Sequence, residues 1–152
     1  MQVPPDFDQD GGRCDCRTVF WGSVLKFLID THLSSWAANE PEKLSGKAVS
    51  LMANPEHELL FSAANIWEIA IKNSLGRDDF KMDARLLQRS LLDNDYTEQA
   101  ITSAHAVFVE SLPSIHQDPF DRILVAQAAA EGITLLTADS NVARYPGPIE
   151  LV

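Results

Sequence analysis

Four acidic residues stand at comparable places along the chain and together could do chemistry. Asp30 closes an apolar run, Glu68 lies in the helix expected after the next run, Asp121 opens a later helix, and Asp139 follows the strand after that helix. Carboxylates gathered in one place repel one another unless a cation shares them. Oxygen ligands with few His or Cys residues nearby suit Mg²⁺ or Mn²⁺, which activate water and stabilise a phosphodiester under attack. The pattern therefore indicates metal-assisted hydrolysis.

Each of these acids also has an ordinary structural explanation. Asp30 can begin a helix, and Glu68 stands four residues before Lys72, which is the spacing of a surface ion pair. Asp118, with Asp121 three residues later, has the pattern of a helix cap. Taken singly, each acid is better explained as a cap, a turn or an ion pair. A topology that brings all four to one place is what favours a site.

The elements that must position the acids alternate between strands and helices. We expect strands over residues 24–30, 58–62, 98–101, 133–137 and 146–152, and helices that begin near residues 31, 44, 63, 83, 103 and 119. This alternation predicts an α/β fold, with a parallel sheet and helices on both faces. In such a sheet the ends of the strands and the starts of the following helices share one edge. Asp121 and Asp139 could meet at that edge.

Bulk properties exclude several classes of protein. The chain has 152 residues, 45% of them hydrophobic and 22% charged, which is ordinary for one globular domain. No apolar run approaches the roughly 18 residues of a membrane span and no signal peptide is visible, so we expect a cytoplasmic protein that binds no membrane. A net charge of −10 disfavours nucleic-acid binding through overall charge. It leaves room for a nucleic acid held by bound metal and a local basic patch.

The first 23 residues differ from the rest. Acidic residues and glycines interrupt any period there, so we expect residues 1–23 to be a flexible extension and residues 24–152 to be the folded domain. Cys14 and Cys16, the only cysteines, are too few for a zinc site. Val24 could be encoded by a GTG start codon, and we expect a protein that starts there to be complete in function.

Four segments in a fixed order carry a resemblance to a known family. They read FLIDTHL at residues 27–33, SAANIWEIAIK at 62–72, HQDPFDRIL at 116–124 and LTAD at 136–139. The sequence resembles the PIN-domain ribonucleases, and most closely the VapC toxins of bacterial toxin–antitoxin pairs. It departs from their pattern in the extension before Val24 and in two polar residues, Asn65 and Asn73, within an otherwise apolar helix.

The resemblance implies a fold, a reaction and partners. The fold is a three-layer α/β/α PIN-like fold with a central, mainly parallel sheet. Asp30, Glu68, Asp121 and Asp139 become the catalytic acids that bind Mg²⁺ or Mn²⁺, and Asp118 becomes an accessory acid. The expected reaction is hydrolysis of structured RNA, which leaves 3′-hydroxyl and 5′-phosphate ends. The expected partners are a VapB-type antitoxin and a second copy of the chain.

Other polar side chains have expected supporting roles. The hydroxyls of Thr31, Thr137 and Ser140 are candidates to orient waters or acids, and Lys72, Arg122 and Arg144 are candidates to contact phosphate. We assign His32, His105 and His116 to packing or to the surface rather than to a ligand set.

Two alternatives remain open from the sequence. A catalytically inactive PIN fold would serve as a scaffold that binds RNA or protein, although the complete acid set speaks against it. A phospho-acceptor signalling domain also gathers acids and Mg²⁺ at the strand ends of a parallel sheet. That class needs a lysine late in the chain, and the last lysine here is Lys81. The signalling class is therefore the weaker alternative.

Overall fold

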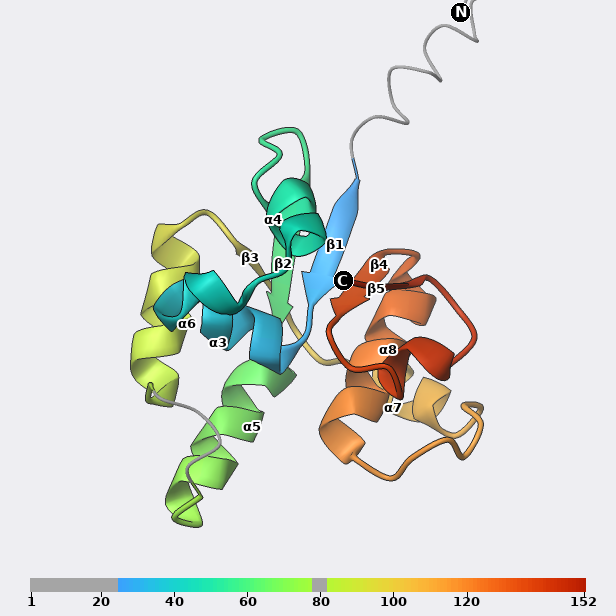
Figure 1. Cartoon of the computed structure of the whole chain (residues 1–152). Helices are drawn as coiled ribbons and strands as arrows, with labels where there is room; N and C mark the ends of the chain where they lie inside the picture. Colours follow the sequence, from blue (N-terminus) through green and yellow to red (C-terminus); the bar gives the residue numbers. More distant parts are fainter. Residues whose placement is uncertain (1–24, 78–81) are drawn as a thin grey trace, which may run out of the picture.

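A parallel sheet forms the centre of the molecule (Figure 1). The computed structural model describes residues 25–77 and 82–152, so the extension expected at residues 1–23 lies outside them. Within the described residues the strands are β1 (Lys26–Ile29), β2 (Glu58–Ser62), β3 (Thr97–Gln99), β4 (Thr134–Thr137) and β5 (Ile149–Leu151). Their order is β3-β2-β1-β4-β5, and all neighbours pair in parallel. The prediction of a mainly parallel sheet is confirmed.

Helices connect the strands and begin where the sequence predicts. They are α3 (Thr31–Asn39), α4 (Gly46–Met52), α5 (Ala63–Ser74), α6 (Ala84–Asp93), α7 (Ser103–Val109) and α8 (Pro119–Glu131), with short 3₁₀ turns η1 (Pro41–Lys43) and η2 (Val142–Arg144). The side chain preceding each α-helix accepts a hydrogen bond from the first turn, which stabilises that end. Gly132 ends α8 with a φ of 70°, a conformation that glycine adopts without strain.

β2 has its predicted bounds, whereas the other four strands are shorter than predicted and one of these is displaced. The strand expected over residues 98–101 runs from Thr97 to Gln99, because Thr102 caps α7 and the chain must leave the sheet before it. The first and last strands likewise occupy only the central part of their predicted ranges. These differences do not alter the sheet order or the placement of the acids.

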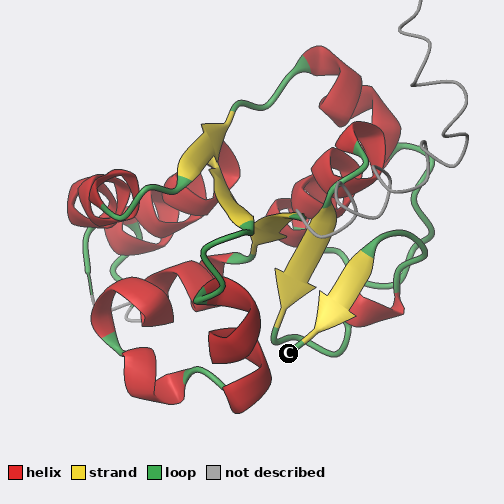
Figure 2. Cartoon of the chain, turned by 90° about the horizontal axis from the view of Figure 1, so that it is seen from above, coloured by secondary structure: helices red, strands yellow, loops and turns green. Residues whose placement is uncertain are grey.

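Both faces of the sheet are covered by helices, as the view from above shows (Figure 2). Leu28 and Leu135 pack on one side with residues of α8, whereas Ile29 and Leu136 pack on the other side in the core that includes Leu33 of α3. The alternation follows from the period of two along a strand. Each such side chain contributes roughly 1.5–3 kcal/mol when fully buried. The predicted three-layer α/β/α fold is confirmed.

The order of the strands creates a switch point in the middle of the sheet. The chain places β2 and β3 on one side of β1, then crosses to place β4 and β5 on the other side. At the carboxyl end of this junction the backbone N–H of Asp30 donates to the carbonyl of Leu136 at 3.1 Å. Ligands of open α/β sheets bind at such points. Among the described helices, none is both long enough and apolar enough to cross a lipid bilayer.

Candidate metal centre

A small cavity of about 80 Å³ lies at the carboxyl edge of the sheet. Its lining consists mostly of acids, together with two cationic or titratable side chains and one hydroxyl: Asp30, Thr31, His32, Glu68, Lys72, Asp118, Asp121 and Asp139. The four predicted acids come from four elements, namely the ends of β1 and β4, the middle of α5 and the first turn of α8. The topology thus brings together residues that are up to 109 positions apart in the sequence.

Asp30 is the most rigidly held of these acids. Its side chain caps α3 by accepting from the Leu33 N–H at 2.8 Å, and its other oxygen accepts from the Thr137 hydroxyl at 2.7 Å and the Ala138 N–H at 3.2 Å. Burial raises the pKa of Asp30, while these hydrogen bonds lower it. The carboxylate is 5% exposed and is fixed from three sides.

Glu68 is held by a chain of buried hydrogen bonds that begins at the start of its own helix. The Ser62 N–H donates to the Asn65 side-chain oxygen at 2.6 Å, and the Asn65 amide donates to the Thr31 hydroxyl at 3.0 Å. The Thr31 oxygen thus accepts from Asn65, and its single proton is donated to Glu68 Oε1, 2.7 Å away. The other oxygen of Glu68 lies 2.8 Å from the Lys72 ammonium.

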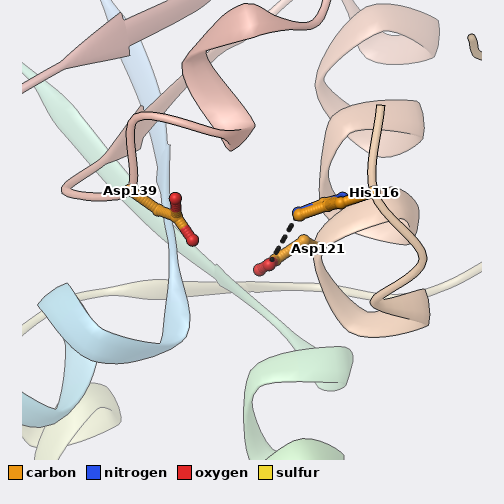
Figure 3. Close-up of side chains that lie close together, drawn as sticks. All are labelled: His116, Asp121 and Asp139. Carbon is orange, nitrogen blue, oxygen red and sulfur yellow. Dashed lines mark hydrogen bonds and ion pairs between the residues drawn. The ribbon is translucent and has the colours of Figure 1, made fainter. Parts of the chain in front are cut away.

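Asp121 and Asp139 face one another across the opening of the cavity, next to His116 (Figure 3). The Nε2 atom of His116 lies 3.2 Å from Asp121 Oδ2. Asp139 is exposed, and its Oδ1 accepts from the Asn141 N–H at 2.8 Å. Its own N–H donates to the Thr137 hydroxyl at 3.0 Å, which links it to Asp30. One ligand atom from each of the three residues in Figure 3 lies within 4.8 Å of the other two.

Asp121 lies in surroundings that disfavour its charged form. Burial, which is the largest cause, and the neighbouring carboxylates of Asp118, Glu68 and Asp30 together raise the pKa of this carboxyl to about 7, whereas His116 acts in the opposite direction. A carboxyl that keeps its proton near neutral pH because of burial and neighbouring acids is typical of sites that hold a cation or transfer protons.

This shift predicts a pH-dependent loss of stability. The folded protein holds the Asp121 proton up to about pH 7, whereas an unfolded chain releases it near 3.8, so the folded state is penalised progressively as the pH rises between these values. The penalty reaches at most about 4 kcal/mol, at roughly 1.4 kcal/mol per pKa unit. We expect the stability of Asp121→Asn relative to wild type to increase steadily between pH 4.5 and pH 8, as measured by urea unfolding with EDTA present. Equal slopes against pH for the two proteins would contradict this assignment.

The structure also places the residues with expected supporting roles. Asp118 caps α8 by accepting from the Phe120 N–H at 3.0 Å, and it lines the acid cavity as well. Thr31 and Thr137 each donate to a cavity acid, as described above. Ser140 is exposed and lines a neighbouring, more open cavity of about 370 Å³ that also contains Asp30 and Asp139. Each of these side chains therefore lies at or beside the acid cluster.

The three basic residues have different surroundings. Lys72 lines the cavity, and Arg144 is exposed on η2. Arg122, in contrast, is directed into the protein: its guanidinium donates to the carbonyls of Pro113 and Val109 at 2.9 and 3.3 Å and to the Tyr145 hydroxyl at 3.0 Å. This geometry corrects the expectation that Arg122 contacts phosphate, because its donors are used to hold the loop before α8.

Sequence reasoning missed His116 and Asn65. His116 was assigned to packing or to the surface, and Asn65 was noted only as a polar residue in an apolar helix. For Asn65 a signal was available, since it stands three residues after Ser62, where a polar side chain completes a capping box. For His116 the sequence offers only its position two residues before Asp118. His105 is buried as a packing residue, with Nε2 2.7 Å from Glu131 Oε2.

Comparison with known proteins agrees with this geometry. Residues 27–148 match the PIN domain family. The chain is 27% identical over 124 residues to Ribonuclease VapC22 of Mycobacterium tuberculosis, and the aligned part covers 80% of this chain and 95% of that protein.

Solved structures with the same fold include several toxin–antitoxin complexes. VapBC2 from Rickettsia felis bound to a DNA fragment from their promoter matches with a TM-score of 0.62 and 15% identity, over 84% of this chain and 99% of that chain. DNA-bound VapBC from Salmonella typhimurium matches with a TM-score of 0.56 and 18% identity, over 83% of this chain and 97% of that chain. These identities show the fold alone. Since the family match spans most of the sequence, the chain belongs to the PIN domain family of nucleases.

Proposed function

We propose that the protein is a metal-dependent endoribonuclease that acts in the cytoplasm as the toxin of a toxin–antitoxin pair. The observation that carries this proposal is the convergence of Asp30, Glu68, Asp121 and Asp139 on one small cavity, where burial and neighbouring carboxylates keep the pKa of Asp121 raised. Membership of a nuclease family and the similarity to a VapC ribonuclease support it.

The donor set fits a hard divalent cation. The cavity presents carboxylate oxygens from several elements, and Mg²⁺ and Mn²⁺ are bound by such oxygens together with water. We assign Asp30, Glu68 and Asp121 as the residues that hold the ion, with Asp139 as a direct ligand or a partner through water. When bound, such an ion stabilises the charge of the scissile phosphodiester and lowers the pKa of a water.

The protein supplies positioning for this reaction. Thr137 and the Ala138 N–H fix one oxygen of Asp30, and Thr31 fixes one oxygen of Glu68, so neither acid has to be ordered when substrate arrives. Lys72 balances part of the charge of Glu68 at the wall of the cavity. We propose Lys72 and Arg144 as the phosphate contacts. Hydrolysis adds water across the phosphodiester and leaves 3′-hydroxyl and 5′-phosphate ends.

An apolar stripe next to the acids supports a protein partner. Trp67, Ile71 and Leu75 lie four residues apart along α5 and are 54%, 36% and 67% exposed. Glu68 and Lys72, which line the cavity, follow two of them directly in the sequence, so the helix that carries the stripe also forms part of the cavity wall. We propose a VapB-type antitoxin as this partner and a homodimer as the form of the toxin; the similar folds solved as toxin–antitoxin complexes support the first assignment.

Removal and return of metal tests the proposed activity. We expect the purified protein, stripped with EDTA, to leave structured RNA intact, and added Mg²⁺ to restore cleavage by a factor on the order of 10³, because the ion provides most of the charge stabilisation. The measurement is gel analysis of a labelled RNA pool, with mapping of the product ends. Calorimetric binding of Mg²⁺ without cleavage of any RNA in the pool would favour the inactive scaffold instead.

A further inference from the structure

His116 lies beside two of the acids assigned to the ion site. It belongs to the loop between α7 and α8, and its ring is directed at Asp121 across from Asp139 (Figure 3). Nε2 of the imidazole, one oxygen of Asp121 and one of Asp139 lie within 4.8 Å of one another. Around a six-coordinate ion with bonds of about 2.1 Å, opposite ligands are roughly 4.2 Å apart and adjacent ligands roughly 3.0 Å apart. The separation of 3.2 Å between Nε2 of His116 and Oδ2 of Asp121 is already close to that of adjacent ligands, so it is Asp139 that must move toward the other two to share one ion.

The second ring nitrogen of His116 has a hydrogen-bond partner, as the second nitrogen of a metal-binding histidine usually does. Nδ1 of His116 lies 3.0 Å from the hydroxyl of Tyr145, whose side chain is buried. The oxygen of that hydroxyl can accept a hydrogen bond from Nδ1–H, while its own proton is donated to the His116 carbonyl at 3.2 Å. Arg122 donates to the same hydroxyl at 3.0 Å and holds it in place. The ring can therefore carry its proton on Nδ1 and present the lone pair of Nε2 to the cavity.

We propose that Nε2 of His116 is a nitrogen ligand of the divalent ion, together with Asp121 and Asp139, and that it makes the site prefer Mn²⁺ to Mg²⁺. The inference rests on the proposed metal-dependent function. Asp121 and Asp139 also line the acid cavity, so the imidazole adds a donor to that site and does not build a separate one. Imidazole binds transition-metal ions more strongly than it binds Mg²⁺, which selects oxygen ligands.

Pulsed electron paramagnetic resonance of the Mn²⁺-loaded full chain tests this ligand directly. We expect a ¹⁴N modulation from a coordinated imidazole in wild type and its loss in His116→Gln. Titration should show that His116→Gln weakens Mn²⁺ binding by about tenfold or more while Mg²⁺ binding changes much less. His32 is the matched control, since it is a histidine that lines the acid cavity but does not belong to the trio in Figure 3, and His32→Gln should keep the nitrogen signal.

The outcomes separate the inference from the proposed function. Wild-type protein that binds Mn²⁺ without nitrogen coupling, or a signal lost in His32→Gln and kept in His116→Gln, would overturn the role of His116 and leave the nuclease intact. Absence of both Mn²⁺ binding and RNA cleavage would instead overturn the nuclease, and the ligand assignment with it. Because the wild-type spectrum needs no variant, the test holds even if His116→Gln folds poorly.

Discussion

Replacement of Asp121 by Asn, or of Glu68 by Gln, is expected to lower RNA cleavage by on the order of 10³-fold or more. Each change removes an anionic oxygen from the cation site while the shape of the side chain is kept. Asp30→Asn should have the same effect on cleavage. The measurement is the single-turnover rate on a labelled RNA at saturating Mg²⁺. Full cleavage by all three purified variants would rule out the metal-nuclease mechanism.

The three variants should differ in the stability of the folded state, although all lose cleavage. Asp121→Asn should melt at or above wild type without metal, because it removes a carboxyl that its neighbours repel. Asp30→Asn should lower the free energy of unfolding by roughly 1–3 kcal/mol, since an amide cannot accept all three of the hydrogen bonds that the carboxylate accepts.

The control variant is at Asp83, which caps α6 in the same way through the Leu86 N–H at 2.8 Å. It does not line the cavity, so Asp83→Asn should cleave RNA like wild type.

Expression of the wild-type chain alone should arrest bacterial growth, and co-expression of its cognate antitoxin should restore it. We expect growth to stop because uncontrolled RNA cleavage removes transcripts, and to recover because an antitoxin arginine can bind the cavity acids through charge-assisted hydrogen bonds and exclude the ion. Colony counts on inducing medium measure both effects. Asp121→Asn at the same protein level is the control, and arrest by this variant would show that toxicity does not come from cleavage.

The part of the site that could be predicted is the part fixed by local pattern. Asp30 follows an apolar run. Asp121 stands in the first turn of a helix whose start is predicted by Asp118 as a cap and Pro119 as the first helical residue. A parallel sheet brings strand ends and helix starts to one edge, whatever the details of packing. The meeting of Asp30, Asp121 and Asp139 therefore follows from element order, as does the three-layer fold, whereas Glu68, in the middle of α5, was assigned through the resemblance.

The missed and mistaken residues depend on contacts that no local pattern encodes. His116 takes its position from Tyr145, which is 29 residues away and follows η2. Arg122 is a candidate phosphate contact in the sequence and directly follows Asp121, but successive helical residues point about 100° apart. That rotation turns its guanidinium from the cavity to the loop before α8. Asn65 is buried because both ends of its amide are bonded, which a hydrophobicity pattern cannot show.

The central position of β1 ties activity to completion of the chain. Asp30 and Glu68 belong to the part that builds β1, β2 and β3, whereas Asp121 and Asp139 belong to the part that builds α8 and β4. The hydrogen bond between Thr137 and Asp30 joins residues 107 positions apart, a pairing that raises contact order and slows folding. A chain that has been synthesised only as far as α5 therefore holds half of the acid set, and its Asp30 lacks the hydrogen bond from Thr137. We expect such a fragment to leave RNA intact, since the cavity is complete only when β4 has joined β1.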